Sequence, residues 1–299
     1  MSVTMTQGKP LYLHLGAHRT GTSSFQMMLS QNRALLTSAG FDLAYPGRDD
    51  IPQGTLGLRL PAPRAVEQWE SKFVPLCERE LQRHATDGSH AMILSEENIP
   101  GRMIHFAAGQ FYPAAQARMQ TLAAAAQAPV LRAVLVVRDY RALFVSAWRK
   151  RAEDNKASPF KTGRYNMLHM DRGWPDLVRL IQEHLKPQEL VVIDYPRRGQ
   201  SVDILGLLVP ELSALPLREP DKRVNHSATD AALAALQRRY HQGEKLKRKV
   251  WQKIIAEHRE DKRQLGLSVF TARQERILKG RYEAHLEEIA AMPAVQLLR

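Results

Sequence analysis

The sequence has a single cysteine, Cys77, and this scarcity excludes two kinds of site at once. One cysteine cannot form a disulfide within the chain, and it cannot supply the several thiolates of a cysteine-based zinc site. A free cysteine usually packs as a small apolar residue, so we expect Cys77 to be buried on a helix. The eleven histidines form no H-E-x-x-H pattern or tight cluster, and the sequence therefore predicts no dedicated metal site.

Long apolar runs are also missing. No run approaches the about 20 residues that a membrane-spanning helix needs. The first ten residues, MSVTMTQGKP, lack the apolar core of a secretory signal. The G-x-S-x-G elbow of a serine nucleophile does not occur either. We therefore expect a cytoplasmic protein without a transmembrane segment, and the sequence leaves its oligomeric state open.

What the chain does have is positive charge and enough apolar residues to form a core. Hydrophobic residues make up 44% of the sequence, and 43 Lys and Arg residues against 31 Asp and Glu residues leave a net charge of +12. A surface of this sign favours anionic partners, such as nucleotides, nucleic acids, anionic glycans or a membrane face, and does not choose among them. The basic run Lys245–Lys253 is typical of a solvated helix face.

Apolar segments that resemble strands alternate with helical segments over the first 220 residues. The predicted strands are Leu11–Leu15, Phe41–Tyr45, Ala91–Ser95, Ala133–Val137 and Leu190–Ile193. The predicted helices are Thr22–Ala39, Ala65–His84, Pro113–Gln127, Tyr140–Glu153, Trp174–Leu185 and Val202–Leu208. This alternation predicts an α/β protein with a three-layer, P-loop-like fold and a central, mostly parallel sheet.

The character of the sequence changes after Pro220. From Thr229 to about Met292 the pattern indicates two or three helices and no strand. We therefore expect a nucleotide-binding α/β domain over residues 1–220 and a helical extension, packed on that domain, over residues 221–299. Two segments, Asp49–Pro63 and Asn155–Met170, are predicted to be loops of a length that can cover a site.

The segment between the first strand and the first helix has the G-x-x-x-x-G-x-[ST] spacing of a phosphate-binding loop. The two glycines permit the backbone to turn successive amides inward, and the helix that follows adds its positive end. The hydroxyl groups of Thr22, Ser23 and Ser24 are further donors. The residues predicted to bind phosphate here are Gly16, Ala17, His18, Arg19, Thr20, Gly21, Thr22 and Ser23.

This loop lacks the lysine that nucleoside-triphosphate loops place directly after the second glycine, where Thr22 stands instead. The positive charge comes from Arg19, with His18 beside it. No strand ends in a clear magnesium-binding aspartate, Asp194 being the weak exception. Sulfuryl transfer from an adenylyl phosphosulfate fits this loop better than Mg·ATP chemistry, because a sulfuryl group carries less negative charge than a phosphoryl group and depends less on a metal.

At these residues the sequence resembles the sulfotransferases that use 3′-phosphoadenosine 5′-phosphosulfate (PAPS), in particular the bacterial branch related to the Golgi glycan and heparan sulfotransferases. GAHRTGTS resembles the 5′-phosphosulfate loop of the family, with Arg19 in place of its usual catalytic lysine. The substitution keeps the positive charge and gives up a residue that readily donates a proton. Arg138 after the strand AVLVV, with Ser146 eight residues later, resembles the 3′-phosphate motif of the family, except that Tyr140 replaces its usual proline.

A third similarity concerns Glu96, which follows a buried strand. The glycan sulfotransferases have their general base at a similar position, so the resemblance implies that Glu96 is the base, with Glu97 as the alternative. The resemblance covers Leu11 to about Leu208, with a weaker similarity around Asp221–Leu236 that includes Arg223. It implies that PAPS is held by the loop with Arg138 and Ser146, without a metal, and that the acceptor is a glycan, a lipid or a metabolite rather than a nucleic acid. The catalytic residues that it implies are Arg19, Glu96 and His18.

Two other functions are compatible with the same sequence. A P-loop kinase or NTPase would explain the loop, but Thr22 in the lysine position and the lack of a clear magnesium aspartate count against it. A non-catalytic, basic protein that binds polyanions would explain the charge, but it does not require the ordered spacing of the two motifs.

Overall fold

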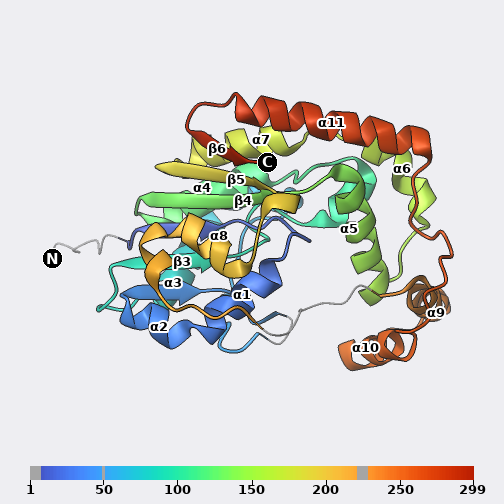
Figure 1. Cartoon of the computed structure of the whole chain (residues 1–299), viewed down its shortest axis with the longest axis horizontal. Helices are drawn as coiled ribbons and strands as arrows, with labels where there is room; N and C mark the ends of the chain where they lie inside the picture. Colours follow the sequence, from blue (N-terminus) through green and yellow to red (C-terminus); the bar gives the residue numbers. More distant parts are fainter. Residues whose placement is uncertain (1–7, 49–50, 221–227) are drawn as a thin grey trace.

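A six-stranded parallel sheet forms the centre of the molecule in the computed structural model, which describes residues 8–48, 51–220 and 228–299. Arg223 lies outside these residues. The strand order is β2-β3-β1-β4-β5-β6, and every neighbouring pair runs parallel (Figure 1). The strands are β1 (Leu11–His14), β2 (Phe41–Ala44), β3 (Ala91–Ser95), β4 (Val130–Val137), β5 (Glu189–Asp194) and β6 (Val295–Leu298).

Helices cover both faces of this sheet and make the fold a three-layer α/β structure. Successive strand residues point to opposite faces, so Val134 packs in one apolar cluster and Leu135 in the other. One face is covered by α1 (Thr22–Gln31), α2 (Arg33–Ser38) and α8 (Ser201–Leu208). The other is covered by α3 (Val74–His84), α4 (Ala115–Ala126), α7 (Trp174–Leu180) and α11 (Ala272–Ala290). The predicted fold class is therefore confirmed.

All five predicted strands occur, and their ends differ from the prediction by at most three residues. Cys77 is fully buried on α3, as predicted, and burial raises the pKa of its thiol to about 12. The predicted helix Thr22–Ala39 is broken at Asn32, whose side chain donates to the carbonyl groups of Met28 and Arg218. The predicted helix Ala65–His84 is regular only from Val74, after a 3-10 segment (Pro63–Gln68) and a π turn (Trp69–Phe73).

In the second half of the chain one expectation was wrong, and one element was not predicted. The segment Asn155–Met170, predicted to be a loop, contains helix α6 (Phe160–Leu168), because Phe160 and Met167 are apolar residues that the core buries. A strand that was not predicted, β6, pairs with β5 and extends the sheet. The region from Thr229 to about Met292, which was predicted to be helical, contains α9 (Asp230–His241), α10 (Arg248–Glu257) and α11.

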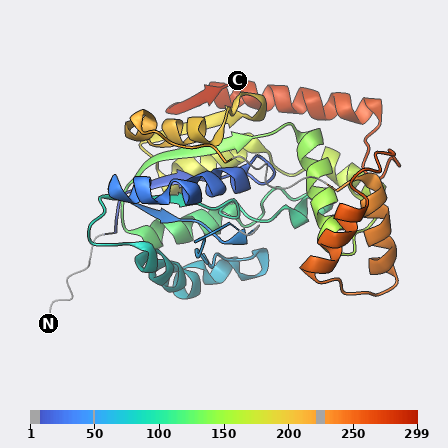
Figure 2. The ribbon, with the colours of Figure 1, turned by 60° about the horizontal axis from the view of Figure 1, so that its bottom comes forward.

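Helices α9 and α10 lie at one end of the molecule, beside α5 (Tyr140–Asp154) rather than over the sheet (Figure 2). Arg149 on α5 forms an ion pair with Asp230 on α9 over 2.5 Å, and its second terminal nitrogen donates to the carbonyl group of Ala228. Leu233 packs in the small apolar cluster between these helices. Among the described residues, no helix is both long enough and apolar enough to cross a membrane.

Candidate functional site

The site lies at the edge of the sheet where the parallel strands end. Ligands bind at this edge in open α/β sheets, near the point where successive strands are added on opposite sides. Here β1 lies between β3 and β4, and a cavity with a volume of about 1790 Å³ opens beyond them. Residues that follow β1, β2, β3, β4 and β5 all line this cavity, among them Arg19, Arg48, Glu96, Arg138 and Arg198.

Arg19 joins the two motifs that the sequence analysis singled out. Its Nε atom donates to the Oγ atom of Ser146 on α5 over 2.8 Å, and its carbonyl oxygen accepts a hydrogen bond from Nη1 of Arg138 over 2.7 Å. The predicted loop, Arg138 and Ser146 are thus in direct contact. Arg19 adopts a φ angle of 64°, which is uncommon for a residue with a side chain and occurs mostly where the surrounding structure requires it.

The other loop residues serve partly to build the loop itself. The amide of Ala17 donates to the carbonyl group of Val136, and Gly16 accepts from the amide of Val136, so both residues continue the pairing of β1 with β4. The hydroxyl groups of Thr20 and Thr22 donate to the carbonyl oxygen of Ala17 over 2.6 and 3.2 Å. These two hydroxyl groups therefore close the turn, although Thr22 was expected to donate to a ligand.

Helix α1 begins directly after the loop and presents its amino-terminal turn to the cavity. Gly21 precedes this helix with a φ angle of 101° and contributes no side-chain cap, and the first turn contains no acidic residue. Thr22, Ser23 and Ser24 line the cavity here. The amides of a first helical turn and the positive end of the helix form a site that suits an anion.

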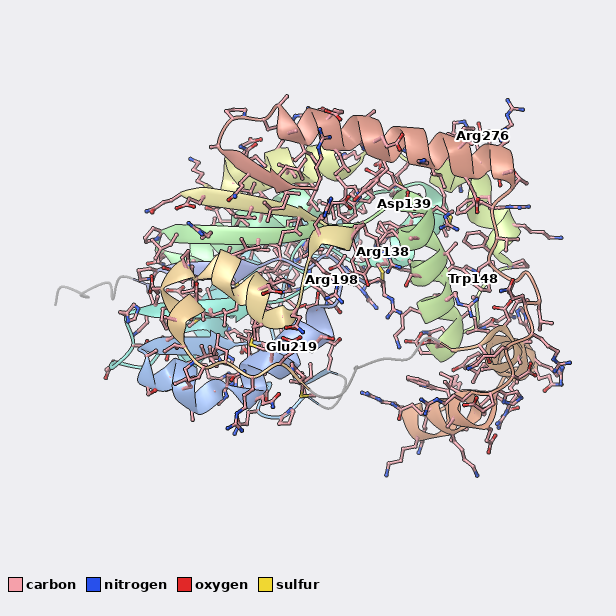
Figure 3. The ribbon with its side chains drawn as sticks, viewed as in Figure 1. Arg138, Asp139, Trp148, Arg198, Glu219 and Arg276 are labelled. Atoms are coloured by element: carbon pink, nitrogen blue, oxygen red, sulfur yellow. The ribbon has the colours of Figure 1, made fainter. Side chains whose placement is uncertain are left out.

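Arg138 occupies the neighbouring strand end and lies close to a second arginine, Arg198 (Figure 3). Both guanidinium groups lie over the ring of Tyr195, at 4.7 Å for Arg138 and 5.1 Å for Arg198. Burial lowers the pKa of Arg138, and Arg19 and Arg198 lower it further, but an arginine stays charged at neutral pH. A side chain at position 21 would overlap the guanidinium group of Arg198, which thus lies directly against the start of α1.

Arg19, Arg138 and Arg198 form a cationic cluster at the loop, and Asp139, the residue after Arg138, is an acidic group whose charge acts on Arg138. Among the described residues, no carboxylate lies within salt-bridge distance of Arg19, Arg138 or Arg198. Three positive charges held together attract an anion to the site, because its charge reduces their mutual repulsion. The arrangement is therefore suited to binding phosphate or sulfate groups.

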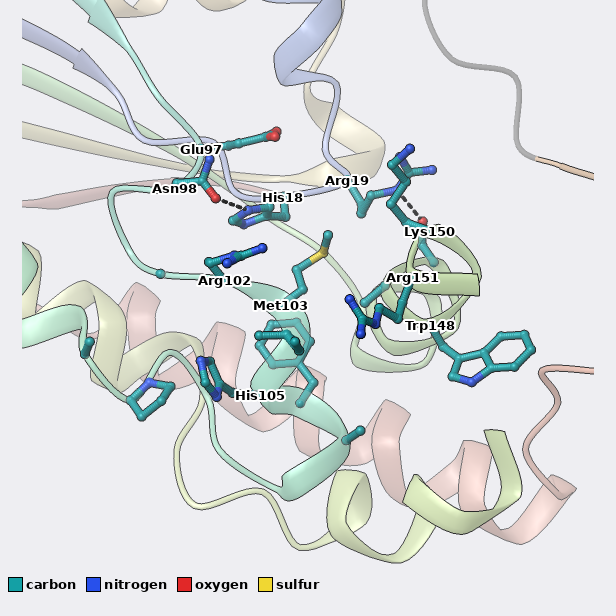
Figure 4. A pocket seen from close by; sticks show the side chains of 18 of the residues that line it. His18, Arg19, Glu97, Asn98, Arg102, Met103, His105, Trp148, Lys150 and Arg151 are labelled. Atoms are coloured by element: carbon teal, nitrogen blue, oxygen red, sulfur yellow. Dashed lines mark hydrogen bonds between the residues drawn. The ribbon is translucent and has the colours of Figure 1, made fainter. Parts of the chain in front are cut away.

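His18 is buried and connects the loop to the residues after β3. Its Nε2 atom lies 3.1 Å from Oδ1 of Asn98 (Figure 4). Its Nδ1 atom lies 3.4 Å from the hydroxyl oxygen of Tyr112. Burial lowers the pKa of His18, while Glu97 opposes this shift. The imidazole is therefore neutral at neutral pH, so Arg19 rather than His18 carries the positive charge of the loop.

The two candidate carboxylates differ in their surroundings. Oε1 of Glu96 accepts hydrogen bonds from Nη2 of Arg48 over 2.5 Å and from the amide and side chain of Asn98 over 2.7 and 2.9 Å. The side chain of Glu97 is more exposed, at 24% against 6% for Glu96, and lies 3.9 Å from Arg48. Both residues line the cavity, as expected for a carboxylate at this edge of the sheet.

Sequence reasoning missed three residues of this site, namely Arg48, Tyr195 and Arg198. Each comes within a few residues of the carboxyl end of a strand: Arg48 follows β2, and Tyr195 and Arg198 follow β5. The signal that would have found them is the basic or aromatic residue after each predicted strand, since all these ends meet at one edge. Asp194, the weak magnesium candidate, accepts a hydrogen bond from the hydroxyl group of Tyr282 over 2.6 Å.

Comparison with known proteins adds one distant similarity. No protein-family model matches the chain, and no curated protein matches it. Among solved structures, the crystal structure of a sulfotransferase from Alicyclobacillus acidocaldarius aligns with 82% of this chain and 99% of its own, at 14% sequence identity and a TM-score of 0.38. At that TM-score the similarity carries no argument about the fold or the activity of this chain.

Proposed function

We propose that this chain is a sulfotransferase that moves a sulfuryl group from PAPS to a hydroxyl or amine acceptor. The observation that carries the proposal is the convergence of Arg19, Arg138 and Ser146 in one cavity, beside a helix start that lacks the lysine of nucleoside-triphosphate loops. The position of these residues in the resembling motifs supports the same assignment.

The residues present fit the two anionic ends of PAPS. The first turn of α1 and the side chain of Arg19 would hold the 5′-phosphosulfate, because the positive end of a helix and a cation stabilise a phosphate oxyanion. Arg138 and the hydroxyl group of Ser146 would hold the 3′-phosphate, since the arginine fork suits a phosphate dianion. Within the described residues, no group of three His, Cys, Asp or Glu side chains is placed to hold a metal ion.

Glu96 is the proposed general base. Arg48 and Asn98 contact its Oε1 atom and so orient the carboxylate, and we assign Oε2 as the atom that takes the proton of the acceptor. When bound, PAPS supplies a sulfuryl group whose bond to the 5′-phosphate oxygen breaks as its bond to the acceptor oxygen or nitrogen forms, and the electron pair leaves with adenosine 3′,5′-bisphosphate. Arg19 stabilises the negative charge that develops on that leaving phosphate.

Calorimetry tests the proposal directly. The protein is titrated with adenosine 3′,5′-bisphosphate and, separately, with Mg·ATP at the same ionic strength. We expect the bisphosphate to bind tightly and without metal, so that EDTA leaves its Kd unchanged. Magnesium-dependent ATP binding without bisphosphate binding would overturn the proposal in favour of a kinase or NTPase. Mass spectrometry of hydroxyl and amine acceptors incubated with PAPS then measures the transfer itself, as a mass gain of one sulfuryl group.

A further inference from the structure

The cavity extends well beyond the residues proposed to hold PAPS. Its volume of about 1790 Å³ exceeds the roughly 300–1,000 Å³ that is common for pockets of small molecules. The walls away from the phosphate loop consist of residues 58–64, residues 101–107 with the 3-10 segment Met103–Ala108, and the end of α5 with the residues after it. This part of the cavity has room for an acceptor beside the nucleotide.

Positive charge also dominates this second part. The whole cavity is lined by eleven Lys and Arg residues against three acidic ones, Glu96, Glu97 and Asp154. Several of the cations have other roles. Arg118 is buried and donates to backbone carbonyl groups, among them those of Asn98 and Pro61, and Arg48 contacts Glu96. The charge that these contacts do not explain lies mainly on exposed arginines of the walls away from the phosphate loop.

Two of these arginines, Arg102 and Arg151, extend from opposite walls toward the space between them (Figure 4). Arg102 precedes the segment Met103–Ala108. Arg151 lies five residues beyond Ser146 on α5, which places it about 7.5 Å further along the helix axis. Both are exposed, and no described carboxylate is within salt-bridge distance of either.

A second anion would balance this second pair of charges. The phosphates of the nucleotide are matched by Arg19, Arg138 and Arg198 near the loop, so they do not account for Arg102 and Arg151. Positive charges that line a concave, low-dielectric wall attract an anion and raise its local concentration. A guanidinium group presents paired donors that fit a carboxylate, a sulfate or a phosphate.

We propose that Arg102 and Arg151 form an acceptor subsite for an acid group, and that the acceptor is therefore an anionic molecule. It would carry the reacting hydroxyl or amine group together with a carboxylate, sulfate or phosphate group of its own. This inference rests on the proposed function and specifies its acceptor class. A single-stranded nucleic acid fits less well, because Trp148 points away from the space between the two arginines and donates its Nε1 hydrogen to the carbonyl group of Ser158 (Figure 4).

The test uses four sugars that differ in one group: glucose, glucuronate, glucose 6-sulfate and glucose 6-phosphate. Each is titrated by ligand-observed NMR at constant ionic strength into protein saturated with adenosine 3′,5′-bisphosphate, which blocks the phosphate loop. We expect the three anionic sugars to bind at least tenfold more tightly than glucose. The preferred anion identifies the source: a preference for glucuronate indicates a uronic acid, and a preference for the phosphate indicates a phosphorylated sugar or headgroup.

Arg102→Gln and Arg151→Gln should each lower the preference for anionic sugars at least threefold, and the double variant should abolish it. The Kd of the bisphosphate should stay within twofold of its original value. Arg276→Gln is the matched control. The substitution removes the same charge, and Arg276 points outward from α11 (Figure 3). Equal binding of glucose and the anionic sugars, or a preference that survives in the double variant, would overturn the proposal. If the bisphosphate itself does not bind, the proposed function fails, and titration of the bisphosphate-free protein still tests this subsite.

Discussion

The Nε atom of Arg19 donates a hydrogen bond to the Oγ atom of Ser146 over 2.8 Å, between residues that are 127 positions apart in the sequence. This contact ties the loop after β1 to the helix after β4. Arg138 completes the connection, because its side chain donates to the backbone of Arg19. The side chain of Arg19 therefore both carries charge and fixes the distance between the two proposed phosphate sites.

Substitution of Arg19 should separate these two roles. Arg19→Lys keeps the charge but loses the hydrogen bond to Ser146, so we expect bisphosphate binding to weaken less than tenfold. Arg19→Ala loses both, and a hydrogen bond that involves a charged group contributes about 1.5–3 kcal/mol, which corresponds to roughly ten- to hundredfold weaker binding. Both variants bear a similar backbone cost at φ 64°, so their comparison isolates the side chain. Unchanged calorimetric affinity in Arg19→Ala would contradict this role.

Arg138→Ala should also weaken bisphosphate binding, because the 3′-phosphate dianion loses the guanidinium group proposed to hold it. We expect a loss of about tenfold or more in Kd, measured by calorimetry. Arg141→Ala serves as the control three residues further along the chain, because Arg141 on α5 is exposed and pairs with Glu275 outside the cavity. A similar loss in both variants would show that general charge, rather than the position of Arg138, controls affinity.

Glu96→Gln should lower turnover of PAPS at least a hundredfold and leave the Kd of the bisphosphate nearly unchanged. The glutamine retains an oxygen that can accept from Arg48 and Asn98, but it cannot take a proton. Glu97→Gln is the matched control one residue away. If Glu97→Gln loses turnover and Glu96→Gln keeps it, the base is Glu97 instead.

Much of the fold was predictable from local sequence. VLVV and LVVI are apolar on both faces, which is typical of strands in the middle of a parallel sheet, and they form the adjacent strands β4 and β5. The loop was predictable because glycine spacing between a strand and a helix has few structural explanations. The rule that ligands bind at the carboxyl ends of parallel strands then placed the residues after β1, β3 and β4 at one edge.

The features that were missed depend on contacts between distant residues. Strand β6 has four residues and is only partly buried, so its sequence lacks the apolar run of a central strand, and its pairing with β5 defines it. The break at Asn32 reflects hydrogen bonds between its side chain and the backbone of Arg218. Arg198 reaches the phosphate loop through a turn after β5 that local propensity does not specify.

Stability should fall in mild acid because of His14. This residue is buried beside Ser95, and burial lowers the pKa of its imidazole to about 3. Below about pH 6.5 the imidazole of His14 takes up a proton in the unfolded chain but not in the folded protein. The free energy of unfolding is therefore not reduced by His14 above pH 6.5, and it falls progressively as the pH is lowered from 6.5 toward 3. Between pH 7 and 5 the expected loss in the free energy of unfolding is about 2 kcal/mol. Urea unfolding at both pH values measures it.

His14→Gln should remove this part of the pH dependence, whatever it does to stability at pH 7. His241→Gln is the control, because His241 is exposed on α9. A pH dependence that is equally steep in His14→Gln and in the original protein would show that other groups cause the acid sensitivity.

Tyr140, which replaces the proline of the resembling motif, should support the position of Arg138. Its hydroxyl group accepts a hydrogen bond from the amide of Trp174 over 2.8 Å and lies 2.7 Å from Nδ1 of His285 on α11. The indole of Trp174 in turn donates to the carbonyl group of Arg138 over 2.9 Å. Tyr140→Phe leaves the buried amide of Trp174 without this acceptor, so we expect a loss of about 1–3 kcal/mol in the free energy of unfolding.

Because the same contacts lead to Arg138, Tyr140→Phe should also weaken bisphosphate binding at a temperature where the variant remains folded. Tyr165→Phe is the matched control. It also removes one tyrosine hydroxyl group, but Tyr165 is 70% exposed on α6. A variant that is less stable but binds the bisphosphate normally would restrict Tyr140 to folding. Weaker binding without a loss of stability would instead show that the hydroxyl group acts mainly through the position of Arg138, and that helix α11 helps to shape the nucleotide site.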